Sequence, residues 1–277
     1  MKSFQELRSF ASSLPENGVE MPVLFIGHGS PMNGIEDNAF SKRWKEMGQK
    51  IPLPSAVIVV SAHWFTRGTK ITAMDFPKTI HDFGGFPDAL YQVQYPAPGN
   101  PLLARDVAEM VRSVQVELDH DWGLDHGTWT IVRNMYPDAK IPVLQLSIDY
   151  TKGGDFHYAL AAEMQSLRKK GVLIIGSGNM VHNLRMVDWS KLNEPGFGYE
   201  WAHEMNFRFK ELILKGLHDE LVHYDRLGKA ALLAIPTPEH YLPLVYSLGV
   251  SRSADNIEIF NDTALGGSLT MTSVKWG

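Results

Sequence analysis

The sequence predicts an α/β protein, a single domain whose central, mostly parallel (mixed) sheet is flanked by helices on both faces. Runs of Val, Ile and Leu without polar alternation are typical of strands buried on both faces of a parallel sheet, and such runs begin near Val23, Ala56, Pro142 and Val172. Amphipathic segments between them favour strand–helix–strand units. The 277 residues show no fixed repeat and no low-complexity linker, so we expect one domain over residues 1–277.

The first half of the chain alternates helix and strand signals. We expect residues 1–20 to form a helical extension, whose helix leads through the turn Pro15-Glu16-Asn17-Gly18 into the first strand. A Pro-, Gly- and aromatic-rich loop follows the second strand and has a length typical of an active-site cover. The expected elements, in order, are helix Phe4–Ser13, strand Val23–Ile26, helix Phe40–Gln49, strand Ala56–Ser61, loop Phe76–Asn100, helix Leu102–Ser113 and strand Ser113–Leu118.

The second half continues this alternation. A helix with Leu160, Met164 and Leu167 on one face is expected to end at Gly171, because glycine favours the left-handed conformation that closes helices. The tail GGSLTMTSVKWG alternates like a late strand. The expected elements are strand Pro142–Ser147, helix Phe156–Lys170, strand Val172–Gly176, helix Trp201–Lys215 and a strand in the tail.

Composition narrows the possible partners and surroundings. A formal net charge of −5 gives no basic footprint for a phosphate backbone, so we expect no nucleic-acid partner. We expect no membrane association, because no apolar stretch reaches the roughly 18 residues of a spanning helix. The N-terminus lacks the apolar centre of a signal peptide, which favours a cytoplasmic location. Without cysteine, any metal must be held by His, Asp or Glu.

Four hydrophobic runs each deliver a histidine at or just past their C-terminal ends. They read VLFIGHGSP with His28, AVIVVSAHW with His63, VLIIGSGNMVHNL with His182 and ALLAIPTPEH with His240. A single histidine beside an apolar run is more often a hydrogen-bonded core or surface residue than a ligand. Four histidines at such strand ends favour one shared metal-binding cleft, because open α/β sheets build their sites at the carboxyl ends of their strands. Imidazole suits zinc or iron.

Six motifs together resemble the class III extradiol ring-cleavage dioxygenases, most closely the 4,5-DOPA dioxygenase branch. They are GHGSPMN, SAHWFTRG, TIHDFGGFP, GLDHGTW, GSGNMVHNLR and TPEHYLPL, and the resemblance runs from about Met21 to the C-terminus. It implies one α/β domain with a non-haem metal held by His28, His63 and His240. It adds His182 either as a fourth metal contact or as a catalytic base beside the metal.

The same resemblance assigns a catalytic role to His126 in GLDHGTW, as the residue that takes a proton from a substrate hydroxyl and returns one during oxygen–oxygen cleavage. The alternative is a turn histidine that caps a helix over Thr128–Tyr136. Glu239, next to His240, could supply a carboxylate ligand, but an all-histidine site is the preferred interpretation. His81 either reaches the pocket or bonds within its own turn.

Three classes of function therefore stand. The first is an extradiol dioxygenase that cleaves a DOPA-like catechol with O2, using one divalent metal ion per chain. Fe(II) would serve catalysis, and Zn(II) is plausible as the bound ion. The second is a zinc-dependent hydrolase at the same site. The third is a non-catalytic binding protein of this fold. The sequence leaves open the exact catechol, the cleavage position, the physiological metal and the oligomeric state.

Overall fold

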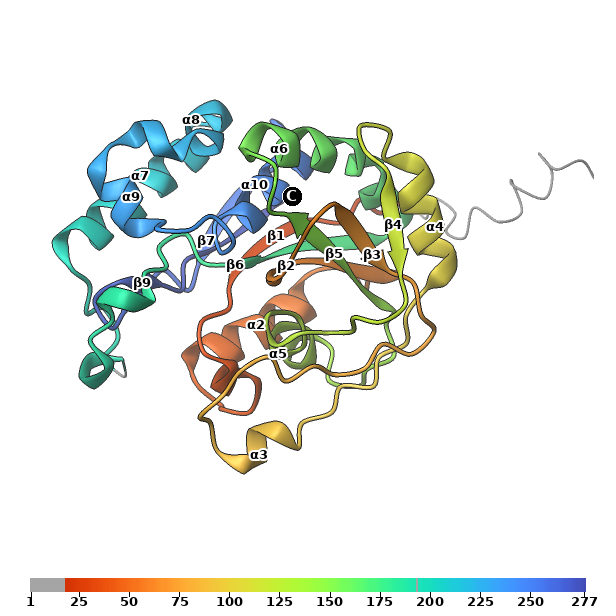
Figure 1. The fold of residues 1–277 in the computed structure, drawn as a ribbon, viewed down its shortest axis with the longest axis horizontal. Helices are drawn as coiled ribbons and strands as arrows, with labels where there is room; N and C mark the ends of the chain where they lie inside the picture. Colours follow the sequence, from red (N-terminus) through yellow and green to blue (C-terminus); the bar gives the residue numbers. More distant parts are fainter. Residues whose placement is uncertain (1–17, 193) are drawn as a thin grey trace, which may run out of the picture.

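A computed structural model describes residues 18–192 and 194–277, and the helix predicted over Phe4–Ser13 lies outside them. The chain builds one eight-stranded sheet in the order β4-β3-β5-β2-β6-β1-β10-β7, and β8 and β9 form a separate pair (Figure 1). The strands are β1 (Val23–Gly27), β2 (Ala56–Thr66), β3 (Thr69–Thr72), β4 (Val116–Asp119), β5 (Val143–Asp149), β6 (Val172–Gly178), β7 (Ile257–Phe260), β8 (Ala264–Leu265), β9 (Leu269–Thr270) and β10 (Ser273–Trp276).

The four central strands, β5, β2, β6 and β1, run parallel to one another. Antiparallel pairs flank them, because β3 is antiparallel to β5 and β10 is antiparallel to both β1 and β7. The mostly parallel, mixed sheet predicted from the buried runs is thus confirmed. All four central strands end at the same edge of the sheet, where ligand sites of this architecture are built.

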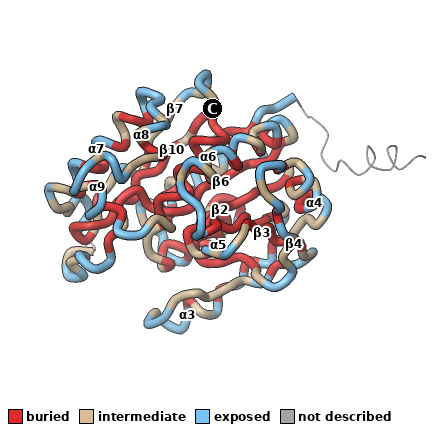
Figure 2. The backbone as a smooth tube through the Cα atoms, turned by 45° about the horizontal axis from the view of Figure 1, so that its top comes forward, coloured by how far each residue is buried: buried red, intermediate tan, exposed pale blue. Residues whose placement is uncertain are grey.

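Helices cover both faces of the sheet (Figure 1). Neighbouring residues of one strand face different cores: Val23 and Phe25 pack with α4, α6 and α10, whereas Leu24 and Ile26 pack with α2 and α5. The deepest burial follows the strands (Figure 2). The helices are α2 (Ala39–Lys50), α3 (Asp88–Tyr91), α4 (Pro101–Met110), α5 (His126–Met135), α6 (Gly154–Glu163), α7 (Glu200–Leu214), α8 (His218–Val222), α9 (Lys229–Ala234) and α10 (Leu242–Val250).

Two expected elements differ in the structure. The run before His240 is not a strand, because its ALLA segment belongs to helix α9. Alanine and leucine are strong helix formers, and the run has no β-branched residue before Ile235, so local propensity favours the helix. The helix expected over Phe156–Lys170 divides into α6 and a 3-10 segment at Gln165–Lys170. Gly171 does end it, with a φ of 75°.

Helix α10 was not anticipated from the sequence. Every residue of LPLVYSLGV in this helix is buried, so the segment lacks the polar face by which a surface helix is recognised. Gly249 allows close packing on α6, since a Cβ there would lie 2.5 Å from the carbonyl oxygen of Tyr158. The helix lies against β1 and β6 on one face of the sheet.

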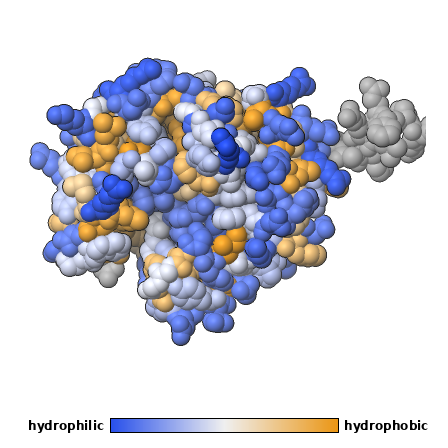
Figure 3. All heavy atoms as spheres, viewed as in Figure 1, coloured by the Kyte–Doolittle hydropathy of each residue, from blue (hydrophilic) through white to orange (hydrophobic). Residues whose placement is uncertain are grey.

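The surface in Figure 3 is largely hydrophilic, and its hydrophobic residues form several separate groups. None of the helices within residues 18–192 and 194–277 combines the length and the apolar character needed to cross a membrane.

Candidate metal centre

The site lies at the carboxyl edge of the central strands. Because β2, β6 and β1 are neighbours, the segments that carry His63, His182 and His28 meet there. His28 directly follows β1, and His182 lies four residues beyond β6. His63 lies within β2, where the register with β5 shifts between Val60 and Phe65. Irregularities of this kind re-aim side chains near active sites.

His28, His63 and His126 form the tightest group. One ligand atom from each lies within 4.8 Å of the others, a spacing that could hold a metal ion. The Nε2 atoms of His28 and His63 face each other at 3.1 Å. The rings of His63 and His126 have centroids 3.9 Å apart. These three residues come from three distant segments of the sequence.

His240 and His182 extend this group. The His240 ring lies 5.3 Å from His28 and 5.2 Å from His63, centroid to centroid. His182 stacks on His240 at 3.6 Å with an interplanar angle of 6°. The backbone N–H of Asn179, just after β6, donates to the carbonyl of His240 at 2.9 Å. The structure therefore brings all four predicted ligands and the predicted acid–base histidine into one cluster.

His126 is placed by the start of α5. Asp125, and not His126, caps that helix, because the Asp125 carboxylate accepts from the backbone N–H of Thr128. Asp125 is fully buried and also accepts from Ser61 Oγ at 2.8 Å and from Gln145 Nε2 at 2.6 Å. Burial and the nearby Asp82 raise the pKa of Asp125 to about 6. This network fixes the helix start against strands β2 and β5.

The sequence reasoning missed Asp82. Its Oδ2 lies 3.2 Å from Nδ1 of His63 and 2.9 Å from Nδ1 of His126, and its Oδ1 accepts from the His126 backbone N–H at 2.8 Å. Burial by itself would raise the pKa of Asp82, but hydrogen bonding and the charges of the two histidines bring it below its ordinary value. The one sequence signal for this residue was its position in the TIHDFGGFP motif.

The buried histidines favour their neutral form. Burial and neighbouring histidines hold the pKa of His28 and of His240 well below the ordinary value. Burial, followed by the charge of His126, lowers the pKa of His63 to about 3. Burial lowers the pKa of His182 to about 4. Neutral imidazole is the form that binds metals, so these rings can act as ligands over a wide pH range.

The donor set fits a divalent transition metal. Ser177 Oγ donates to the carbonyl of Gly127 at 2.6 Å, so it accepts from Nδ1 of His28 at 3.0 Å and leaves Nε2 of that ring as a free donor atom for a metal. Such partners on the second ring nitrogen are usual for metal-binding histidines. The buried Nδ1 of His240 has no hydrogen-bond partner among the described residues. Uncharged nitrogen donors of this kind suit iron and zinc.

The remaining candidates from the sequence are His81 and Glu239, and three aromatic residues, Phe83, Trp64 and Tyr241, lie next to site residues in the chain. His81 bonds within its own loop, to the carbonyl of Val93 at 3.0 Å. Phe83 contacts the His126 ring, with centroids 5.7 Å apart. Trp64 and Tyr241 belong to the core, where Trp64 stacks on a neighbouring tryptophan and Tyr241 is fully buried. Glu239 accepts from Thr237 Oγ1, and its Oε1 is 3.6 Å from Nδ1 of His240.

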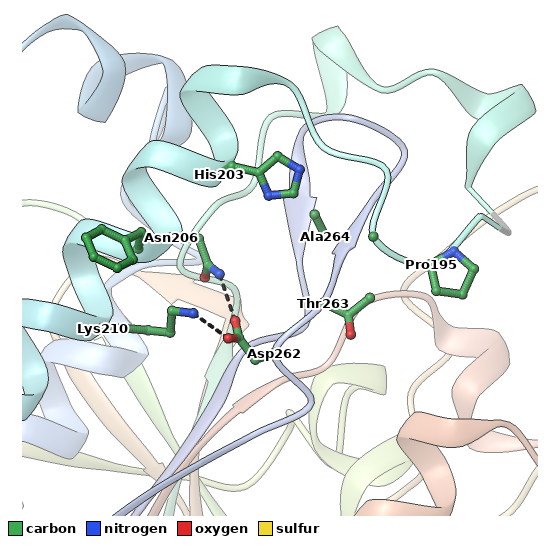
Figure 4. Close-up of a pocket in the computed structure, with 9 residues that line it drawn as sticks. Pro195, His203, Asn206, Lys210, Asp262, Thr263 and Ala264 are labelled. Atoms are coloured by element: carbon green, nitrogen blue, oxygen red, sulfur yellow. Dashed lines mark hydrogen bonds and ion pairs between the residues drawn. The ribbon is translucent and has the colours of Figure 1, made fainter.

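A surface pocket of about 480 Å³ lies elsewhere, between α7 and the segment that joins β7 to β8 (Figure 4). Three of its polar side chains are paired with one another. Asp262 accepts from Asn206 at 2.8 Å and forms an ion pair with Lys210. None of the five clustered histidines lines this pocket, so it is separate from the metal centre.

A histidine cluster at the carboxyl edge of a mostly parallel sheet, with helices on both faces, is typical of a metal-dependent α/β enzyme. Residues 22–266 match the family model described as the catalytic LigB subunit of aromatic ring-opening dioxygenase. The chain belongs to this family, and it is an extradiol ring-opening dioxygenase. Of the three classes of function that the sequence allowed, the family selects the oxygenase.

Relatives match over nearly the whole chain. The 4,5-DOPA dioxygenase extradiol of Escherichia coli is 47% identical over 266 residues, which are 94% of this chain and 96% of that protein. The 4,5-DOPA dioxygenase extradiol of Beta vulgaris is 35% identical over 92% of this chain and 96% of its own length. A crystal structure of an uncharacterized Escherichia coli protein superposes with a TM-score of 0.78 and 42% identity, covering 93% of this chain and 100% of that one.

Proposed function

We propose that the chain holds one Fe(II) ion through His28, His63 and His240, with His182 as a fourth contact, and opens the ring of a DOPA-like catechol. The observation that carries this proposal is the convergence of these histidines at one sheet edge in a chain of the ring-opening family. The bound iron would supply the electron transfer between catechol and O2 that the side chains cannot provide. Zinc could occupy the same nitrogen donors without supporting that redox chemistry.

His126 would move the protons in this scheme. Ring opening of a catechol requires that a hydroxyl loses a proton on binding and that a proton is delivered when oxygen–oxygen bond cleavage occurs. The His126 ring is adjacent to His63 and is held by the Asp82 carboxylate. Phe83 covers the same ring from the loop side and would limit the access of water.

A groove beside His182 supports a substrate that carries an amino-acid group. Its volume is about 120 Å³, and its walls include Arg185 and Glu239. Arg185 is exposed and forms no ion pair within the described part of the chain, whereas Glu239 is held by Thr237. One positive and one negative side chain on the same groove complement the carboxylate and the ammonium of an α-amino acid. DOPA joins such a group to a catechol ring, as the names of the relatives suggest.

The test is anaerobic reconstitution with Fe(II), followed by oxygen uptake with four catechols. These are DOPA, the analogue without the ammonium (3,4-dihydroxyphenylpropanoate), the analogue without the carboxylate (dopamine) and 4-methylcatechol. We expect one O2 consumed per DOPA, with both oxygen atoms entering a yellow ring-opened semialdehyde, and no reaction with zinc-loaded protein. If the iron-loaded protein consumes no O2 with any catechol, the function is wrong. If DOPA is no better than 4-methylcatechol, only the assignment of the substrate fails.

Arg185→Gln refines this test. We expect the preference for DOPA over dopamine, as a ratio of kcat/KM, to fall by about 10-fold or more, because a charge-assisted contact to the substrate carboxylate is lost. Arg105→Gln is the matched control, since Arg105 is an exposed arginine on α4 at the far edge of the sheet. An unchanged ratio in Arg185→Gln would remove Arg185 from substrate recognition.

A further inference from the structure

The Asp82 carboxylate is shared between two histidine rings of the metal centre. Its Oδ2 is hydrogen-bonded to Nδ1 of His126 at 2.9 Å and lies 3.2 Å from Nδ1 of His63, and its Oδ1 accepts from the backbone N–H of His126. We propose that Asp82 is a positioning residue that fixes one tautomer on both rings at once. One carboxylate would thereby orient both a metal ligand, His63, and the proton-transfer residue, His126.

The chemistry follows from what each atom can donate. An ionised carboxylate only accepts hydrogen bonds, so a neutral imidazole that bonds to it through Nδ1 must carry its proton on that atom. Its Nε2 then has a free lone pair. On His63 this lone pair faces Nε2 of His28 at 3.1 Å, where a metal would be held. On His126 the corresponding lone pair is available to accept a proton from a substrate hydroxyl.

The loop is anchored at the residues that directly precede Asp82, which fixes the carboxylate. Before it, the backbone N–H of Ile80 donates to the carbonyl of Leu124 at 2.7 Å, and Leu124 donates back to Lys78 at 2.8 Å. Next to it, the His81 ring bonds to the carbonyl of Val93 at 3.0 Å. These bonds tie the long loop to the turn that precedes α5. The anchored backbone therefore holds Asp82 in place.

The remaining ring of the tight group has its own partner. Ser177 Oγ fixes the tautomer of His28 by accepting a hydrogen bond from its Nδ1. No second carboxylate in the described residues lies within 4 Å of a nitrogen of His63 or His126. Among the carboxylates of the described residues, Asp82 alone can fix the tautomers of both rings. Because Asp82 comes from the loop and the rings come from β2 and α5, it also joins the loop to the catalytic edge.

The decisive variant is Asp82→Asn. An asparagine side chain has one acceptor oxygen and an NH2 group that only donates. If the amide oxygen takes the place of Oδ2, the NH2 group meets the backbone N–H of His126; if it takes the place of Oδ1, the NH2 group meets both Nδ1–H groups. Either orientation sets two donors against each other, so we expect the amide to move and at least one ring to lose its partner and its tautomer. We expect metal affinity to fall by about 10–100-fold, the usual effect of losing a partner of a ligating histidine. At saturating Fe(II) we expect kcat for a catechol to fall by about 10²-fold or more, with a smaller change in KM.

The tautomers can be read without turnover, in proton–nitrogen correlation spectra of the histidine rings of the zinc-loaded, ¹⁵N-labelled protein. Removing His63 or His126 assigns the signals. We expect both rings to carry the proton on Nδ1 in the parent protein and at least one to lose that pattern in Asp82→Asn. Asp88→Asn is the matched control, because Asp88 is an exposed carboxylate of the same loop. It should leave both signals in place.

Asp82→Glu keeps the experiment decisive if Asp82→Asn does not fold, because it preserves the carboxylate. It should retain the Nδ1–H pattern and recover part of the turnover. Asp82→Asn with both tautomers intact and parental turnover would overturn the proposal, and so would Asp82→Glu with both tautomers changed. The catalytic readout rests on the proposed function, whereas the spectra do not. A parent protein with Nδ1–H rings but no oxygen uptake would refute the function and leave the role of Asp82 standing.

Discussion

Gly127 is the position where one methyl group should perturb the metal centre most directly. It lies in the first turn of α5, directly after His126. A Cβ at this position would lie 2.6 Å from Ser61 Oγ and 2.9 Å from Cδ2 of His63. Ordinary contact begins at 3.4 Å, so Gly127→Ala must displace these groups by roughly 0.5–0.8 Å. Ser61 cannot rotate away without losing its hydrogen bond to Asp125.

The energetic balance follows from these contacts. Overpacking of this kind costs about 1–3 kcal/mol, and replacing glycine by alanine in a helix returns at most about 1 kcal/mol. We therefore expect Gly127→Ala to lower the free energy of unfolding by about 1–2 kcal/mol. We also expect a loss of metal affinity of about 10–100-fold, because the His63 ring is shifted while its donor atoms remain.

Urea denaturation of the metal-free protein and competition with a chelator measure the two effects separately. Gly153→Ala is the control, since a Cβ at Gly153 meets no atom within 4 Å and its φ is negative. This variant should match the parent in metal affinity. Parental metal affinity in Gly127→Ala, together with a normal fold, would show that the position of His63 does not govern metal binding. The proposed ligand set would then be wrong.

Four further outcomes are expected. His63→Ala should lose most of its metal in elemental analysis while its circular dichroism stays close to the parent, and full occupancy would contradict its role as a ligand. His126→Ala should keep metal and bind catechol but turn over about 10²–10⁴-fold more slowly, and an unchanged rate would make this histidine a structural residue. His182→Ala decides between two roles, because loss of metal indicates a fourth contact, whereas retained metal with lost turnover indicates a base. Arg168→Ala should lower the free energy of unfolding by about 3–5 kcal/mol at pH 7, because Asp255 then loses its buried partner. Burial alone would raise the pKa of Asp255, but Arg168 brings it below its ordinary value. This part of the stabilisation is therefore present above the unfolded pKa of 3.8 and is lost as the pH falls through the folded value, so the difference between parent and variant should become smaller in acid.

Local pattern was sufficient for the four central strands of the sheet but missed β3, β7 and one of the covering helices. The apolar runs at β1, β2, β5 and β6 predicted strands because burial on both faces removes polar alternation. The same absence of alternation hid α10, where a helix is surrounded by core and has no polar face. It also misassigned the run before His240, whose alanines and leucines form α9.

The histidines themselves were visible in the sequence, and so was their common edge. Parallel strands that are neighbours must end together, so His28, His63 and His182 could be placed near one another from the runs that carry them. His126 and His240 follow loops, and their roles were implied by the family resemblance. The structure brings their rings into the same cluster.

The sequence by itself thus determined the class of fold, the family and the residues of the cluster, because each depends on composition, local periodicity or motif. Only the tertiary structure decided how the cluster is held. Asp82 reaches His63 and His126 from a loop whose path no periodicity specifies. Ser177 orients His28 from the neighbouring strand. Hydrogen bonds between segments far apart in sequence depend on distance and direction in space, and no local pattern encodes either.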